Sequence, residues 1–112
     1  MTGIKQVKQG LVTILTVPSA LIGDLITALS EQLNTCLDTG ELHLILDFHL
    51  VSCLDSEALE MLLSYSRLAR RKSGAIKIVH VTDVCHDILV ATRLEQFLEI
   101  YPDIPSALRS CL

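Results

Sequence analysis

One segment of the sequence, LHLILDFHLVSCLDSEALEMLL (residues 42–63), restricts the fold more than any other. Its beginning, residues 42–48, is short, apolar and bounded by turn-forming residues, which is typical of a strand buried on both faces of an α/β sheet. Its end opens a run of apolar side chains at helical spacing, which predicts a helix over residues 56–72. A short acidic turn therefore joins a buried strand to the amino end of a helix.

The start of this helix is a place where a negative group is favoured. The first four backbone N–H groups of a helix lack acceptors within it, and the summed peptide dipoles leave partial positive charge there. Asp55 and Ser56 stand at this start, and either side chain can cap the helix. A phosphoryl group on Ser56 would instead add about −1.5 to −2 charges beside Asp55 and Glu57 and change this surface sharply. Spacing alone favours the cap and leaves the phosphate switch open.

The part of the chain before this segment is predicted to supply one side of the sheet and a first helix. Residues 4–16 have strand character with an interruption at Gly10, so a bent strand or a short hairpin is expected. After Pro18, apolar residues recur at helical spacing and predict a helix over residues 21–37, which ends before Gly40.

The part after the segment continues the alternation of helices and strands. Ser73 and Gly74 stop the middle helix, with Gly74 as its expected left-handed cap. A strand is predicted over residues 75–81, and Thr82 or Asp83 is expected to cap the next helix. The chain then closes with a short edge strand within residues 97–101 and a terminal helix, introduced by Pro102 and Pro105, that runs through Leu112.

These elements fit a single domain over residues 1–112. Half of the residues are hydrophobic but only 4% are aromatic, so the core must be aliphatic and closely packed. Strands that alternate with helices predict an α/β layered domain. No internal repeat or low-complexity linker divides the chain.

The charge and hydropathy patterns argue against two kinds of partner. A formal net charge of −4 opposes nucleic-acid binding, which needs a basic surface to neutralise phosphates. No apolar run approaches the ~20 residues that a membrane-spanning helix requires, so membrane insertion is not expected. One basic cluster lies near the end of the middle helix, where cations complement the helix dipole and are usually solvated. Its members are Arg67, Arg70, Arg71 and Lys72. A cytosolic protein partner is favoured.

The cysteines indicate a reducing compartment. They are widely spaced, form no C-x-x-C pair and come without a recognisable secretory leader. We therefore expect reduced thiols and a cytoplasmic location. The four positions are Cys36, Cys53, Cys85 and Cys111.

The histidines do not form a recognised metal or catalytic pattern. The segment VTDVCHD crowds Asp83, Cys85 and His86 into one turn, but this spacing matches no zinc motif. His43, His49 and His80 are the other candidate ligands, and nothing in the spacing brings them together. No G-x-G-x-x-G motif supports a nucleotide site either. We therefore expect no metal, no cofactor and no enzymatic activity.

Two parts of the sequence resemble the STAS family, the domain shared by anti-sigma factor antagonists and the cytoplasmic tails of sulphate transporters. The stronger part, LILDFHLVSCLDSEALEMLL, is similar to the family's strand, acidic loop and D-S-S-G-L helix start. The second is AIKIVHVTDVCHDILVATRLEQFLEIYPDIPSAL, in which Thr92, Arg93 and Leu94 stand where the family has T-G-L. The family's G-E-L-D segment is represented only loosely by TVPSALIGDL. The resemblance covers almost the whole chain.

The resemblance implies a small mixed β-sheet with about four helices packed mainly on one face. It also implies a non-enzymatic regulator that binds a kinase-type anti-sigma factor reversibly. Asp55 and Ser56 match the family's Asp and phosphorylatable Ser. The partner serine kinase would phosphorylate Ser56 and be released, and a phosphatase is a further candidate partner. The expected partner contacts are Asp55, Ser56, Glu57, Leu59 and Glu60.

The sequence departs from the family beside the expected phosphosite. Glu57 and Ala58 stand where the family has Ser and Gly, so a permanent negative charge lies next to Ser56. Glu57 is compatible with partial mimicry of the phosphorylated state, with a different kinase, or with a member that is never phosphorylated. The main alternative function is an accessory subunit or scaffold of a transporter or multi-STAS signalling complex, without phospho-switching. The sequence leaves the sigma factor, the upstream signal and the oligomeric state open.

Overall fold

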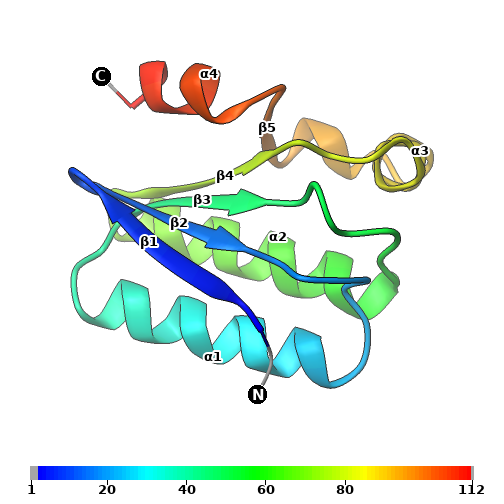
Figure 1. Ribbon diagram of the computed structural model, residues 1–112, viewed down its shortest axis with the longest axis horizontal. Helices are drawn as coiled ribbons and strands as arrows, with labels where there is room; N and C mark the ends of the chain where they lie inside the picture. Colours follow the sequence, from blue (N-terminus) through cyan, green and yellow to red (C-terminus); the bar gives the residue numbers. More distant parts are fainter. Residues whose placement is uncertain (1–2, 112) are drawn as a thin grey trace.

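The structure, a computed structural model, describes residues 3–111 and contains one five-stranded sheet with helices on both faces (Figure 1). The strands are β1 (Lys5–Gln9), β2 (Val12–Thr16), β3 (His43–Asp47), β4 (Ala75–Val79) and β5 (Glu99–Tyr101). The helices are α1 (Asp24–Asp38), α2 (Ser56–Arg71), α3 (Asp83–Ala91) and α4 (Ile104–Arg109), with a short 3-10 turn over Leu94–Gln96. The predicted α/β class is confirmed.

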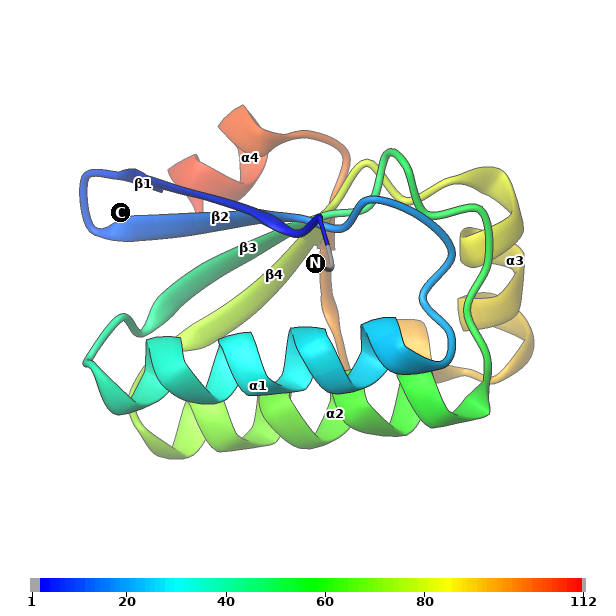
Figure 2. The same cartoon turned by 60° about the horizontal axis from the view of Figure 1, so that its bottom comes forward.

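The sheet is mixed, as predicted. Its order is β1-β2-β3-β4-β5; β1 and β2 form an antiparallel hairpin, and the pairs from β2 to β5 are parallel. Of the two predictions for residues 4–16, the hairpin is therefore confirmed, and Gly10 lies in its turn with a φ of 64°. Because the carboxyl ends of parallel strands meet at one edge, the loops that follow β2, β3 and β4 gather at the same end of the molecule (Figure 2).

The helices divide between the two faces of the sheet. α1 and α2 lie side by side beneath one face, and α3 lies beyond the carboxyl ends of the strands (Figure 2). α4 packs on the opposite face, against β3, β4 and β5. Each face has its own apolar core, so β3 is buried on both sides: Leu44 and Leu46 face α1 and α2, whereas Ile45 belongs to the smaller core under α4. This is why β3 reads as a continuous apolar run.

The first helix begins later than its periodicity predicts, at Asp24 instead of residue 21. Leu21 is fully buried, but it forms an isolated parallel β-bridge with Leu54. Gly23 then takes a left-handed φ of 58° and turns the chain into α1. Leu21, whose apolar side chain suggested a helical turn, therefore joins the loop before α1 to the loop before α2.

The prediction that Gly74 is the left-handed cap of the middle helix is wrong. Ser73 takes that conformation, with a φ of 66°. Gly74 is required for a different reason: a Cβ at this position would lie 2.3 Å from the carbonyl oxygen of Leu42. The absence of a side chain at Gly74 lets α2 return close to the start of β3.

Two of the later predicted elements, the strand over residues 75–81 and the terminal helix, are shorter in the structure. β4 stops at Val79 instead of residue 81, because His80 adopts a left-handed φ of 56°. The terminal helix covers Ile104–Arg109, with Asp103 as its cap and proline in its first turn. The predicted extension through Leu112 includes a position outside the described residues.

Candidate functional site

The start of α2 is built by Asp55, which leaves Ser56 free. Asp55 is the residue before the helix, and its Oδ1 accepts a hydrogen bond from the backbone N–H of Ala58 at 2.9 Å. Ser56 is the first residue of the helix and is exposed. Of the two residues that could cap this helix, Asp55 does so, and the Ser56 hydroxyl is presented to solvent.

The two faces of the first turns of α2 have different surroundings. Ala58 and Leu59 are 0% and 6% exposed and belong to the core. Ser56, Glu57 and Glu60 are exposed on the other side. Three of the expected partner contacts thus lie on the surface with Asp55, whereas Leu59 supports that surface from within the core.

Two loops hold this end of the molecule in place. The backbone N–H of Leu21 donates to the carbonyl of Cys53 at 2.9 Å, which joins the loop before α1 to the loop before α2. The Thr82 hydroxyl donates to the carbonyl of Val51 at 2.8 Å, which joins the same loop to α3. Thr82 occupies the predicted cap position of α3, but its hydroxyl is used for this long-range contact.

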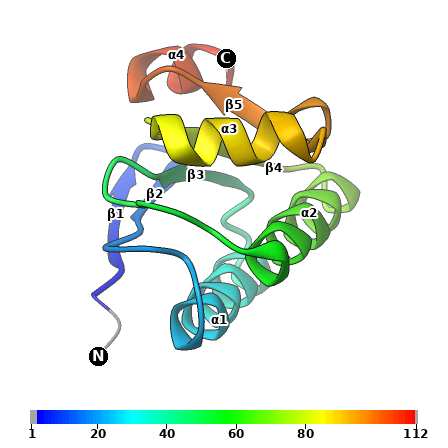
Figure 3. The same cartoon turned by 90° about the vertical axis from the view of Figure 1, so that its right-hand side faces the viewer.

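Exposed apolar side chains lie in these loops and at the start of α3. Ile22 is 47% exposed, Leu50 is 49% exposed and Val84 is 53% exposed. Ile22 follows Leu21, Leu50 precedes Val51, and Val84 lies in the first turn of α3. Figure 3 shows α3, the loop before α2 and the start of α2 on one side of the molecule. This end therefore presents carboxylates, a free hydroxyl and apolar side chains together.

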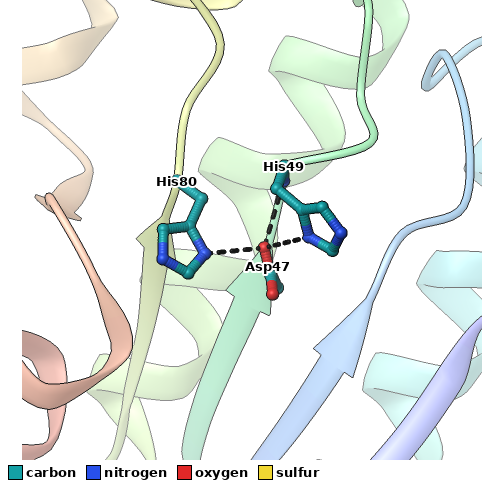
Figure 4. Close-up of side chains that lie close together, drawn as sticks. All are labelled: Asp47, His49 and His80. Carbon is teal, nitrogen blue, oxygen red and sulfur yellow. Dashed lines mark hydrogen bonds and ion pairs between the residues drawn. The ribbon is translucent and has the colours of Figure 1, made fainter.

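A second cluster, which the sequence analysis missed, lies at the carboxyl ends of β3 and β4. Asp47 Oδ1 lies 2.9 Å from Nδ1 of His49 and 3.1 Å from Nδ1 of His80 (Figure 4). The backbone N–H of His49 also donates to this oxygen, at 3.0 Å. Among residues 3–111, only Asp47, His49 and His80 gather in this way, so the other candidate ligands His86 and Cys85 do not belong to the cluster.

The electrostatics of the cluster centre on the Asp47 carboxylate. Burial opposes its ionisation, but the hydrogen bond from the His49 backbone and those with the two imidazoles outweigh burial and lower the pKa of Asp47. The carboxylate is therefore charged at neutral pH and attracts positive groups to this edge of the sheet.

The two buried cysteines are expected to resist alkylation in the folded protein. Burial, with the nearby charge of Glu41, raises the pKa of Cys36 to about 11, and burial also raises the pKa of Cys85. Because the thiolate is the nucleophile, iodoacetamide at pH 8 should modify only Cys53 and Cys111, which are partly exposed, until denaturant is added. Peptide mass spectrometry before and after denaturation measures this, and rapid native labelling of Cys36 would contradict it.

Comparison with known proteins identifies the fold. The family model of the STAS domain matches residues 4–107. An anti-sigma-factor antagonist (STAS) domain protein from Planctomyces limnophilus is 16% identical with a TM-score of 0.84, over 100% of this chain and 99% of its own. The Bacillus cell fate determinant SpoIIAA, solved in its phosphorylated form, is 12% identical with a TM-score of 0.74, over 96% of this chain and 99% of its own.

A transporter shares the fold as well. The murine anion transporter Solute Carrier 26 family member A9 is 20% identical with a TM-score of 0.70, over 87% of this chain but only 17% of the transporter. No match was found among curated proteins. Within residues 3–111, no helix has the length and apolar character needed to cross a bilayer.

Proposed function

The chain belongs to the STAS domain family, and from this we propose that it is an anti-sigma factor antagonist-like regulator switched at Ser56. It binds a kinase-type anti-sigma factor through the surface around the start of α2, and the kinase releases it by phosphorylating Ser56. The observation that carries the proposal is the free, exposed Ser56 hydroxyl at a helix start that Asp55 already caps. A kinase can reach this hydroxyl without breaking the helix cap.

The charges around Ser56 make phosphorylation an effective switch. Asp55, Glu57 and Glu60 are exposed on the same surface, so it already carries several negative charges. A phosphoryl group adds about −1.5 to −2 more, and the positive end of the helix dipole makes that charge tolerable for the fold. The added charge therefore acts mainly on the partner that faces this surface.

The apolar side chains at the same end supply the attraction that the charges modulate. Ile22, Leu50 and Val84 are each about half exposed, and partner association can bury them. Leu59, although an expected contact, is buried in the core and is left out of this surface. Docking through apolar contacts beside a phosphorylatable hydroxyl is the arrangement that partner switching needs.

A transporter-linked function is the second candidate. The fold of this chain is shared with a segment of an anion transporter, which favours a docking subunit of a membrane complex as the alternative. In that case the same end of the domain would dock without any chemistry at Ser56. A scaffold in a multi-STAS signalling complex is the related form of this alternative.

Affinity capture followed by intact-mass analysis distinguishes these functions. The tagged chain is used to capture partners from its native cells, and the eluate is incubated with Mg²⁺ and ATP. We expect recovery of a serine kinase of the histidine-kinase-like ATPase class and a gain of about 80 Da that maps to Ser56. The Ser56→Ala variant should capture the kinase and show no gain in mass. Recovery of transporter subunits without a mass change would overturn the switch and support the alternative.

The capping role of Asp55 gives a stability prediction that is independent of any partner. Asp55→Ala removes the acceptor for the Ala58 backbone N–H and should lower the free energy of unfolding by about 1 kcal/mol, within a range of about 0.5–2 kcal/mol. Asp55→Asn keeps a capping oxygen and should stay close to the parent protein. Urea unfolding followed by circular dichroism measures both, and equal stability of the alanine variant would contradict the role.

A further inference from the structure

The cluster of Asp47, His49 and His80 supports a function of its own. Asp47 and His49 lie at the end of β3, and His80, which follows β4, meets them there (Figure 4). One ligand-capable atom from each lies within 4.8 Å of the other two. We propose that this trio is a binding site for a divalent transition-metal ion of the zinc type.

The donor set fits such an ion. Imidazole nitrogen and carboxylate oxygen bind Zn²⁺ at about 2.0–2.2 Å, and three protein ligands with one open position are a common arrangement. Around a tetrahedral ion with bonds of this length, neighbouring ligand atoms lie about 3.3 Å apart. The distances from Asp47 Oδ1 to the two imidazole nitrogens, 2.9 Å and 3.1 Å, need only a small expansion to reach this value.

The hydrogen bonds of the trio mark the position that an ion would occupy, between Asp47 Oδ1 and the two imidazole nitrogens. Asp47 Oδ1 is within hydrogen-bond distance of both Nδ1 atoms and also accepts from the His49 backbone N–H. One carboxylate oxygen thus serves three nitrogen atoms. A cation would bind Asp47 Oδ1 and the two Nδ1 atoms, and any proton on these nitrogens would move to Nε2 or to solvent. The backbone hydrogen bond would continue to orient the carboxylate.

The exposure of the three side chains allows an ion to enter. The side chain of Asp47 is 10% exposed, whereas those of His49 and His80 are 50% and 37% exposed. The protein therefore covers the carboxylate and leaves the imidazole side open. An ion can reach the site from solvent, and water can occupy its remaining coordination position.

The backbone holds two of the ligands firmly. Asp47 is the last residue of β3 and pairs in register with Val79, the last residue of β4. His80 follows at once, and its left-handed φ of 56° ends the strand with the ring directed at Asp47. Non-glycine residues rarely adopt this conformation. In this conformation, Nδ1 of His80 lies 3.1 Å from Asp47 Oδ1.

Titration of the metal-free chain of 112 residues with Zn²⁺ or Co²⁺ alone tests the proposal. We expect saturable binding of one ion per chain by calorimetry, and visible absorption bands of Co²⁺ without the intense thiolate bands of a cysteine site. Because protons compete with a metal ion for its ligand atoms, affinity should fall as the pH is lowered. The probe is the metal ion itself, so no partner protein is needed.

Matched variants locate the ion. His49→Asn and His80→Asn should each weaken binding by about tenfold or more, whereas His86→Asn, at an exposed histidine outside the trio, should not change it. A Cys53→Ser, Cys111→Ser double variant should bind as the parent does. Thermal melts without metal show whether each variant is folded.

Three results would overturn the proposal. These are failure of both ions to bind the folded protein, equal binding by the His49→Asn and His80→Asn variants, and loss of binding in the double cysteine variant. Ser56 takes no part in this site. The metal proposal can therefore fail while the proposed phosphorylation switch holds, and the reverse is equally true.

Discussion

Ser56→Asp is expected to weaken binding of the captured kinase about 100-fold, while Ser56→Ala binds as tightly as the parent protein. The substitution places a further carboxylate among Asp55, Glu57 and Glu60, all of which are exposed. If this makes one contact repulsive by about 3 kcal/mol, the affinity falls by roughly two orders of magnitude. An acidic residue in the first turn of a helix is favourable, so α2 should remain folded. Calorimetric titration of the kinase with each variant measures the effect.

The control for this prediction is Ser64→Asp. Ser64 is exposed on the same helix, two turns beyond Ser56, so the variant has the same net charge and the same chemistry at another place. It should bind the kinase with at most a small change in affinity. Equal affinities for the alanine, aspartate and parent forms at Ser56 would remove the switch. Equal losses at Ser56 and Ser64 would show that net charge alone determines binding.

Most of the fold follows from local patterns in the sequence. The apolar run of β3 and the helical spacing of α2 are strong signals because β3 is buried on both faces and α2 buries one side only. The start of α1 could not be predicted, because Leu21 is apolar for a long-range reason, its bridge to Leu54. Tertiary pairing overrides periodicity at such positions.

Backbone conformation explains two further differences from the sequence predictions, namely the residue that ends the middle helix and the end of β4. Left-handed residues are usually glycine, but here Ser73, His80 and Arg93 take positive φ values. Arg93 occupies the position of glycine in the family's T-G-L turn, with a φ of 61°. Only the resemblance marked that turn, since arginine carries no such signal.

The two candidate sites differ in how far the sequence reveals them. Ser56 and its charged neighbours are adjacent in sequence, so the helix start and its surface could be predicted together. Asp47 and His80 are brought together only by the register of β3 and β4. The strand predicted over residues 75–81 placed His80 inside the strand, whereas β4 ends at Val79 and His80 lies just beyond it. In the folded sheet Asp47 pairs with Val79, so His80 directly follows the partner of Asp47.

Gly74→Ala is expected to be the most destabilising single-methyl change in this protein, with a loss of about 3 kcal/mol in the free energy of unfolding. The new Cβ would lie 2.3 Å from the Leu42 carbonyl oxygen and 2.7 Å from the Leu42 Cβ. That oxygen accepts the backbone N–H of Ala75 at 2.9 Å, so it cannot move without loosening the entry to β3 and β4. For a domain of this size, the melting temperature should fall by roughly 10–20 °C.

Gly10→Ala is the matched control because it introduces backbone strain without a steric clash. Gly10 has a left-handed φ of 64° but open space around it, whereas Gly74 has no left-handed φ and no space. The backbone strain at Gly10 should cost only about 1–2 kcal/mol. Thermal and urea unfolding of the two variants compares steric exclusion with backbone strain directly. If Gly10→Ala is the more damaging, or if Gly74→Ala melts with the parent, then the close approach of α2 to the start of β3 does not constrain this fold.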